Sequence, residues 1–226
     1  MYGYGSSGTS SGDAMVIGSN GYDEGIGQGP RRVWVLGNEF RDSQTGIRIE
    51  GVEDVWILGN VFHTLNTGIQ IDNKQYRDIT ISGNTLDGMD AGIYSWNGSC
   101  SADSVTLQNN LIGNVSGHHI ELPGCDNATL ANNLVWGTTS VRVGGSTYTS
   151  AGELDGEGFA SGHVDADPQF EDGTLQPAEG SPAVDAGTSL DAYIEAVQDE
   201  YGGAADWDFG HNPRPVASWD IGAWER

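Results

Sequence analysis

The chain has 226 residues, enough for one sizeable domain, and its 32 acidic against 9 basic residues give a formal net charge of -23. This charge excludes nucleic acid as a partner, because carboxylates and phosphates repel one another. It fits a salt-rich, halophilic habitat, where ions screen the self-repulsion, and it fits an ordinary acidic secreted protein equally well. No apolar run is long enough to cross a bilayer, so we expect no membrane insertion.

Five segments repeat one pattern, a short apolar strand followed by Gly-Asn or Asn-Asn. The segments are Val33–Asn38, Val55–Asn60, Ile79–Asn84, Val105–Asn110 and Ala128–Asn133. The asparagines that end them are separated by 22, 24, 26 and 23 positions, a spacing typical of solenoid repeats. The pattern predicts stacked coils over roughly residues 10–145, with the length differences in loops.

A second short strand begins with glycine eight residues after each of the first three asparagines, as Gly46–Glu50, Gly68–Asp72 and Gly92–Trp96. Side chains alternate between the two faces of a strand. The residues expected to point inward are Ile47, Ile49, Ile69, Ile71 and Ile93. Two short strands and a corner per unit predict an all-β, right-handed parallel β-helix of about six coils, each of 22–26 residues.

The repeated asparagines suit the sharp corners of such a solenoid. Asparagine tolerates a left-handed backbone, and its amide can bond to the amides above and below. We therefore predict a structural ladder of Asn38, Asn60, Asn84, Asn110 and Asn133. Cys100 and Cys125 lie about one repeat apart, so stacking favours a disulfide between them over two buried thiols and indicates an oxidising compartment.

Residues 146–226 lack the repeat and are expected to pack on the coils as a cap of the same domain, with one short helix between Ser189 and Tyr201. Their motifs include Asp167–Phe170, Ser181–Gly187 and Asp220–Glu225. This segment resembles the C-terminal segment of right-handed parallel β-helix proteins of the pectate-lyase-like superfamily. The resemblance implies an extracellular or cell-surface protein whose partner is a polysaccharide. Such proteins include polysaccharide lyases, which often use calcium, glycoside hydrolases and uronate epimerases.

The second strands should also present a row of outward side chains, one or two per coil at intervals of about 4.8 Å. The row contains Arg48, Glu50, Gln70, Asp72, Tyr94, Trp96, His119, Glu121 and Arg142. Aromatic faces can hold sugar rings and arginines can hold uronate carboxylates, so Arg48, Gln70, Tyr94, Trp96 and Arg142 are the candidate substrate-binding residues. The alternative interpretation is a solvated sheet face without a ligand.

A lyase-type enzyme acting on acidic, uronate-containing glycans is the favoured function. Abstraction of the proton beside the uronate carboxyl needs a base, for which Lys74 and His119 are the candidates, with Asp72 and Glu121 completing the catalytic set. Glu50 and Asp72, on adjacent coils, would share a calcium ion that bridges the anionic sugar to this acidic protein.

Two alternatives stay open. A glycoside hydrolase needs two carboxyls, about 5 Å apart for retention, which suits Glu50 and Asp72, or roughly 6.5–9.5 Å apart for inversion, which Asp72 and Glu121 approach. A non-catalytic carbohydrate-binding or structural surface module would need neither pair.

Overall fold

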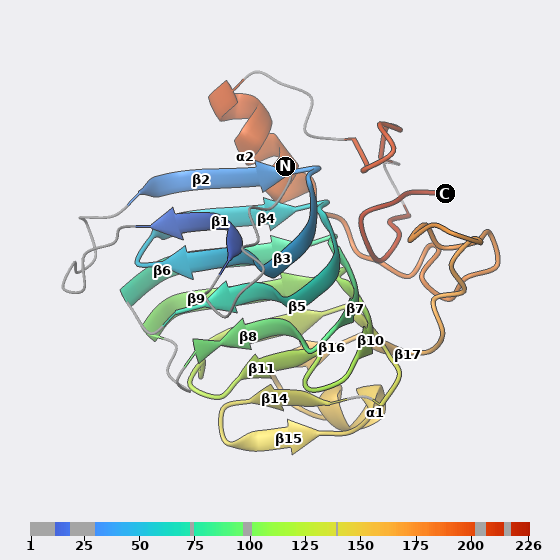
Figure 1. Ribbon diagram of the computed structural model, residues 1–226, viewed down its shortest axis with the longest axis horizontal. Helices are drawn as coiled ribbons and strands as arrows, with labels where there is room; N and C mark the ends of the chain where they lie inside the picture. Colours follow the sequence, from blue (N-terminus) through green and yellow to red (C-terminus); the bar gives the residue numbers. More distant parts are fainter. Residues whose placement is uncertain are drawn as a thin grey trace.

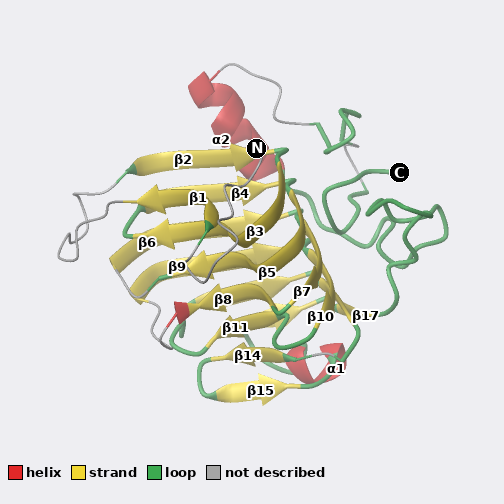
Figure 2. Ribbon diagram, viewed as in Figure 1, coloured by secondary structure: helices red, strands yellow, loops and turns green. Residues whose placement is uncertain are grey.

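The computed structural model in Figure 1 describes residues 12–18, 30–72, 75–96, 101–138, 140–201, 207–214 and 218–226. It confirms an all-β parallel β-helix with few helices. Figure 2 shows the strands stacked in coils, with the described loops of the C-terminal segment on one side of them. Neighbouring strands of the described coils pair in parallel, and β14 with β15 forms an antiparallel hairpin.

The described strands form two sheets. Sheet A contains β1 (Asp13–Gly18), β3 (Glu39–Glu50), β5 (Val61–Ile71), β7 (Thr85–Met89), β8 (Ala91–Ser95), β10 (Leu111–Val115), β11 (Ile120–Leu122), β13 (Leu134–Trp136), β14 (Val141–Val143), β15 (Ser146–Tyr148) and β17 (Val164–Asp165). Sheet B contains β2 (Arg31–Leu36), β4 (Glu53–Leu58), β6 (Gln75–Ser82), β9 (Ser101–Gln108), β12 (Ala128–Ala131) and β16 (Ala160–Ser161).

The core lies inside the coils and consists of ladders of like side chains. The five predicted isoleucines are fully buried, and Ile47, Ile69 and Ile93 are register partners on consecutive coils. The rings of Phe40 and Phe62 stack with their centroids 4.9 Å apart. Each such side chain removed from water contributes roughly 1.5–3 kcal/mol, so these ladders supply much of the stabilisation of the coils.

A hydrogen-bonded asparagine ladder runs along one corner of the coils. The Nδ2 atom of Asn60 donates to Oδ1 of Asn84 over 3.0 Å, and Asn84 donates in the same way to Asn110. Each Oδ1 also accepts the backbone N–H of the asparagine in the preceding coil, as in Asn60 N to Asn84 Oδ1 at 2.9 Å. The amides thus satisfy buried corner groups that water cannot reach.

The left-handed backbone at this corner belongs to the residue before each ladder asparagine, not to the asparagine itself as expected. These residues are Gly37, Gly59, Gly83, Asn109 and Asn132, with φ between 50° and 65°. Glycine and asparagine adopt this conformation at low cost. The repeated dipeptide therefore divides two tasks, since its first residue turns the chain and its second bonds to the neighbouring coils.

Beyond the β14–β15 hairpin, two further short strands continue the sheets. Strand β16 pairs with β12, and β17 pairs with β13 in a register that puts His163 beside Asn133. His163 accepts the ladder's next hydrogen bond at Nε2, 3.3 Å from Nδ2 of Asn133. A short helix, α1 (Ala151–Leu154), capped by Ser150, lies between β15 and β16.

The C-terminal segment lies along the corner of the coils that carries the asparagine ladder, as the loops beside β7 and β10 in Figure 1 show. Asn109 exchanges two hydrogen bonds with the backbone of Thr188, and its own carbonyl accepts from the N–H of Gly222 over 2.7 Å. Helix α2 (Asp191–Tyr201), which matches the predicted helix, follows and buries Leu190 and Ile194 against Trp219.

The predicted disulfide falls partly outside the described residues, because Cys100 is not among them. The described cysteine, Cys125, is buried in the core and is not a free thiol. The pairing of these two residues stays a prediction.

Candidate functional site

The second strands of sheet A present the expected outward row, though with a different membership. Arg48, Gln70, Tyr94, Glu121 and Arg142 are register partners on consecutive coils. Trp96, which follows β8, is 48% exposed, and its ring packs edge to face on that of Tyr94 with the ring centroids 6.1 Å apart. The proposed base Lys74 lies outside the described residues.

The predicted outward orientation of His119 is wrong. Ile120 pairs with Ile93 and Glu121 with Tyr94, so His119 lies two residues before the row and just before β11, and its side chain is fully buried. Its Nε2 bonds to the carbonyl of Trp136 at 2.9 Å, and its Nδ1 accepts the N–H of Ser140. Burial lowers the pKa of His119. A neutral, buried and doubly bonded imidazole cannot reach a sugar on the sheet surface.

Both arginines of the outward row are already ion-paired. Arg48 contacts Asp13 at 3.2 Å and Glu50 at 2.9 Å, and Arg142 contacts Glu121 at 3.2 Å. These pairs leave little unbalanced positive charge to attract a uronate.

The calcium site predicted at Glu50 and Asp72 is not supported. The guanidinium of Arg48 supplies the positive charge beside Glu50, and Gln70 donates to Asp72 over 2.6 Å. Burial raises the pKa of Asp72. Within the described part of the chain, no three His, Cys, Asp or Glu side chains are placed to hold a metal ion.

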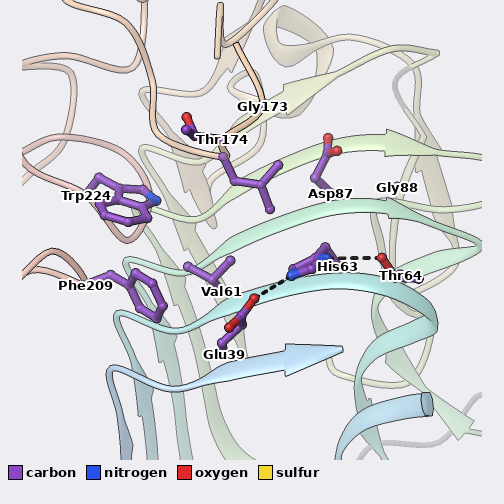
Figure 3. Close-up of a pocket in the computed structure, with 11 residues that line it drawn as sticks. Glu39, Val61, His63, Thr64, Asp87, Gly88, Gly173, Thr174, Phe209 and Trp224 are labelled. Carbon is purple, nitrogen blue, oxygen red and sulfur yellow. Dashed lines mark hydrogen bonds and ion pairs between the residues drawn. The ribbon is translucent and has the colours of Figure 1, made fainter. Parts of the chain in front are cut away.

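A pocket of about 670 Å³ lies between strands β3, β5 and β7 of sheet A and the C-terminal segment (Figure 3). Its size falls in the range of small-molecule sites. The lining residues are Glu39, Val61, His63, Thr64, Asp87, Gly88, Gly173, Thr174, Leu175, Phe209 and Trp224. The pocket therefore joins strands β3, β5 and β7 to loops more than 80 residues further along the chain.

Polar groups from consecutive coils form the sheet side of the pocket. His63 and Asp87 are register partners, and Nε2 of His63 contacts Oε1 of Glu39 at 2.8 Å. The other ring nitrogen, Nδ1, contacts Oγ1 of Thr64 at 3.1 Å, so the imidazole is fixed at both nitrogens. The hydrogen bond from His63 lowers the pKa of Glu39, which is therefore a carboxylate at neutral pH.

Asp87 stands in a different environment from Glu39. Burial raises its pKa, and Nδ2 of Asn114 donates to its Oδ1 over 2.8 Å. The register partner of Asp87 on the next coil is Gly113, where an added Cβ would come within 2.9 Å of Asp87 Oδ1. Glycine at that position leaves room for the carboxyl group.

Aromatic side chains form the opposite wall. The ring centroids of Phe209 and Trp224 lie 4.9 Å apart, with an angle of 70° between the ring planes. Figure 3 shows both rings across the pocket from His63 and Asp87. An apolar wall facing hydrogen-bonding groups suits a ligand with both kinds of surface. The arrangement can bind a polar ring and can exchange protons with it.

The pocket was not predicted, because the expected site lay on the second strand of each coil. Glu39, His63 and Asp87 lie on β3, β5 and β7, one or three residues after a ladder asparagine, and alternation marks them as outward. Phe209 and Trp224 carry no such signal, since nothing in the sequence indicates where the C-terminal loops dock.

One family model, described as "Periplasmic copper-binding protein (NosD)", matches residues 6–151, which is more than half of the chain. No curated protein matches the sequence. None of the described helices is long and apolar enough to span a membrane.

The described residues do not fit a copper site. Copper prefers imidazole, thiolate and thioether ligands. All five histidines of the chain are among the described residues, and none belongs to a group of three potential ligands there. The described sulfur atoms do not supply a site either, because Met89 and Cys125 are buried in the core and Met15 packs against it.

Proposed function

The chain belongs to the NosD family, and we propose that it is a periplasmic or cell-surface β-helix protein that binds a carbohydrate in the pocket between sheet A and the C-terminal segment. The observation that carries the proposal is the pairing of an aromatic wall, Phe209 and Trp224, with the polar groups of Glu39, His63 and Asp87. Sugars present apolar C–H faces and hydroxyl edges, which such opposite walls complement.

A neutral or amino sugar suits this pocket better than the uronate expected from the sequence. The pocket contains two carboxyl groups and no lysine or arginine among its described lining residues. The formal charge of -23 also repels an anionic chain. A lyase acting on acidic glycans would have to use the outward row, where the arginines are paired and His119 is buried.

Glycoside hydrolysis is the second candidate function, favoured by the opposite pKa shifts of the two pocket carboxyls. Asp87, whose pKa is raised by burial, would protonate the oxygen of the glycosidic bond as it breaks. Glu39, whose pKa is lowered by the hydrogen bond from His63, would take a proton from the water that forms the new bond to the anomeric carbon.

The test is calorimetric titration of the full chain with a panel of neutral, amino-sugar and uronate oligosaccharides. We expect binding of a neutral or amino-sugar oligomer and at least about tenfold weaker binding by Trp224→Ala, a loss of about 1.4 kcal/mol. Trp207→Ala is the matched control, because Trp207 is 47% exposed and does not line the pocket.

Three results would argue against the proposal. The first is that no oligosaccharide of the panel binds. The second is that Trp224→Ala and Trp207→Ala lose the same affinity. The third is that Trp96→Ala loses affinity instead, which would place the ligand on the outward row.

A further inference from the structure

Three buried carboxyl groups surround one buried guanidinium in the C-terminal segment. The side chains of Arg214 and Glu225 are 5% and 4% exposed and form an ion pair. Asp208 and Asp220 are 4% and 2% exposed, and both act electrostatically on Arg214. With every group ionised, the cluster would hold more negative than positive charge away from water, a costly state unless it takes up a proton.

Hydrogen bonds compensate only part of this charge. Oε2 of Glu225 accepts the N–H of Asp220 over 3.1 Å, and the N–H of Glu225 donates to Asp208 over 3.0 Å. Asp208 also accepts from Asn212 at 2.6 Å.

Asp220 is less well satisfied. Its Oδ1 accepts the N–H of Asp185 at 2.8 Å, whereas its buried Oδ2 has no partner in the described structure. The Asp185 carboxylate repels that of Asp220, whereas the backbone of Arg226 and the charge of Arg214 favour the ionised form of Asp220. The side chain of Arg226 pairs elsewhere, with Glu171.

The cluster joins the C-terminal segment to the coils and to the pocket. Nη2 of Arg214 lies 3.3 Å from the position that a Cβ would take on Gly59. The absence of a side chain at Gly59 therefore leaves space for the guanidinium at this corner of the coils. The ring of Trp219 lies 5.1 Å from Arg214 Cζ. The two residues of the aromatic wall are chain neighbours of the cluster. Phe209 directly follows Asp208, and Trp224 directly precedes Glu225.

We propose that Arg214 and Glu225, with Asp208 and Asp220, form a proton-operated latch that holds the C-terminal segment over the pocket. Proton uptake by the cluster closes the latch, and proton loss weakens it. The consequence for ligand affinity rests on the proposed function, whereas the latch itself does not.

The direction of the effect follows from linkage. Burial raises the pKa of Glu225 to about 7 and also raises the pKa of Asp220. A carboxyl whose pKa is higher in the closed state than in water favours the closed state at low pH, and this contribution is lost as the pH rises through about 7. The segment should therefore be held most firmly in mildly acidic solution.

The experiment is hydrogen exchange of the full chain without ligand at about pH 5.5 and about pH 8.5, with rates corrected for intrinsic exchange. We expect the protection of peptides from 207–214 and 218–226 to fall at least about tenfold at the higher pH. Peptides from β5 provide the internal reference. In Glu225→Gln the pH dependence should shrink, whereas Glu171→Gln, which alters the partly exposed pair with Arg226, should retain it.

Equal corrected protection of the wild-type segment at the two pH values would overturn the latch, whatever Glu225→Gln does to folding. Oligosaccharide titration at the same two pH values separates the two proposals. A segment that loosens without any sugar binding retains the latch and removes the proposed function. Sugar binding without any change in the protection of the segment retains the proposed function and removes the latch.

Discussion

Nε2 of His163 accepts a hydrogen bond from Nδ2 of Asn133, so a histidine occupies the sixth position of the asparagine ladder. Its other ring nitrogen, Nδ1, contacts Oδ1 of Asp155 at 2.5 Å. An imidazole that accepts at Nε2 and donates at Nδ1 must be neutral. The ladder therefore ends on a group that titrates, unlike the five amides before it.

His163→Asn should remove an acid sensitivity of the fold. Burial lowers the pKa of His163, so its contribution is complete above the ordinary value of 6.5 and is lost as the pH falls through the folded-state pKa. Asparagine can accept the same bond without titrating. Urea unfolding at about pH 5 and about pH 7.5 should show a smaller difference in unfolding free energy for the variant than for the wild type. A residual difference is expected from buried His119.

His211→Asn is the matched control, because His211 is exposed. The prediction fails if His163→Asn and His211→Asn change the pH dependence equally.

Asn84→Ala should destabilise the coils by about 2–4 kcal/mol, because it leaves several buried groups without partners. Asn84 donates to the carbonyls of Ile57 and Ser82, and its Oδ1 accepts from Asn60. Asn38→Ala at the partly exposed end of the ladder should cost less. Chemical denaturation measures both, and equal losses would mean that the position within the ladder is unimportant.

Gly92→Ala should be more damaging than an ordinary glycine substitution. A Cβ on Gly92 would lie 2.3 Å from the carbonyl oxygen of His119 on the next coil, so the stacked strands would have to separate. Gly145→Ala is the control, since nothing lies within 4 Å of its added Cβ. Thermal melting should show a large decrease for the first variant and almost none for the second.

The predicted disulfide is testable by counting thiols. Without reductant the denatured chain should show no reactive thiol, and after reduction it should show both Cys100 and Cys125. Reduction should lower the free energy of unfolding by about 3 kcal/mol on the chain-entropy estimate. Two thiols before reduction would contradict the pairing.

The coils could be predicted from the sequence because their determinants are local and repeated. The Gly-Asn dipeptide, the alternating isoleucines and the glycine eight residues later each recur at the spacing of one coil, so stacking follows from any two units. The interpretation failed at His119 because this residue precedes β11, where the alternation of a strand does not apply. Glu121, within the strand, keeps the outward face that alternation predicts.

The pocket depends on contacts that no repeat encodes. Trp224 lies opposite Asp87 because the C-terminal segment docks through Asn109, Thr85 and the buried Arg214. These are single contacts between distant parts of the chain, and their residue types are equally common in loops that dock nowhere. The unit that contains β16 and β17 was missed for a related reason, since its ladder residue is His163 instead of asparagine.

All amides of the ladder point the same way, each donating from Nδ2 to the coil that follows it in the chain. Every internal coil consequently offers one acceptor to its predecessor and one donor to its successor. A coil could be duplicated or deleted as a whole without reversing any bond, provided that the last unit still ends on an acceptor such as His163. The ladder thus permits evolution to change the length of the rod in whole coils while its terminus and the direction of its bonds stay the same.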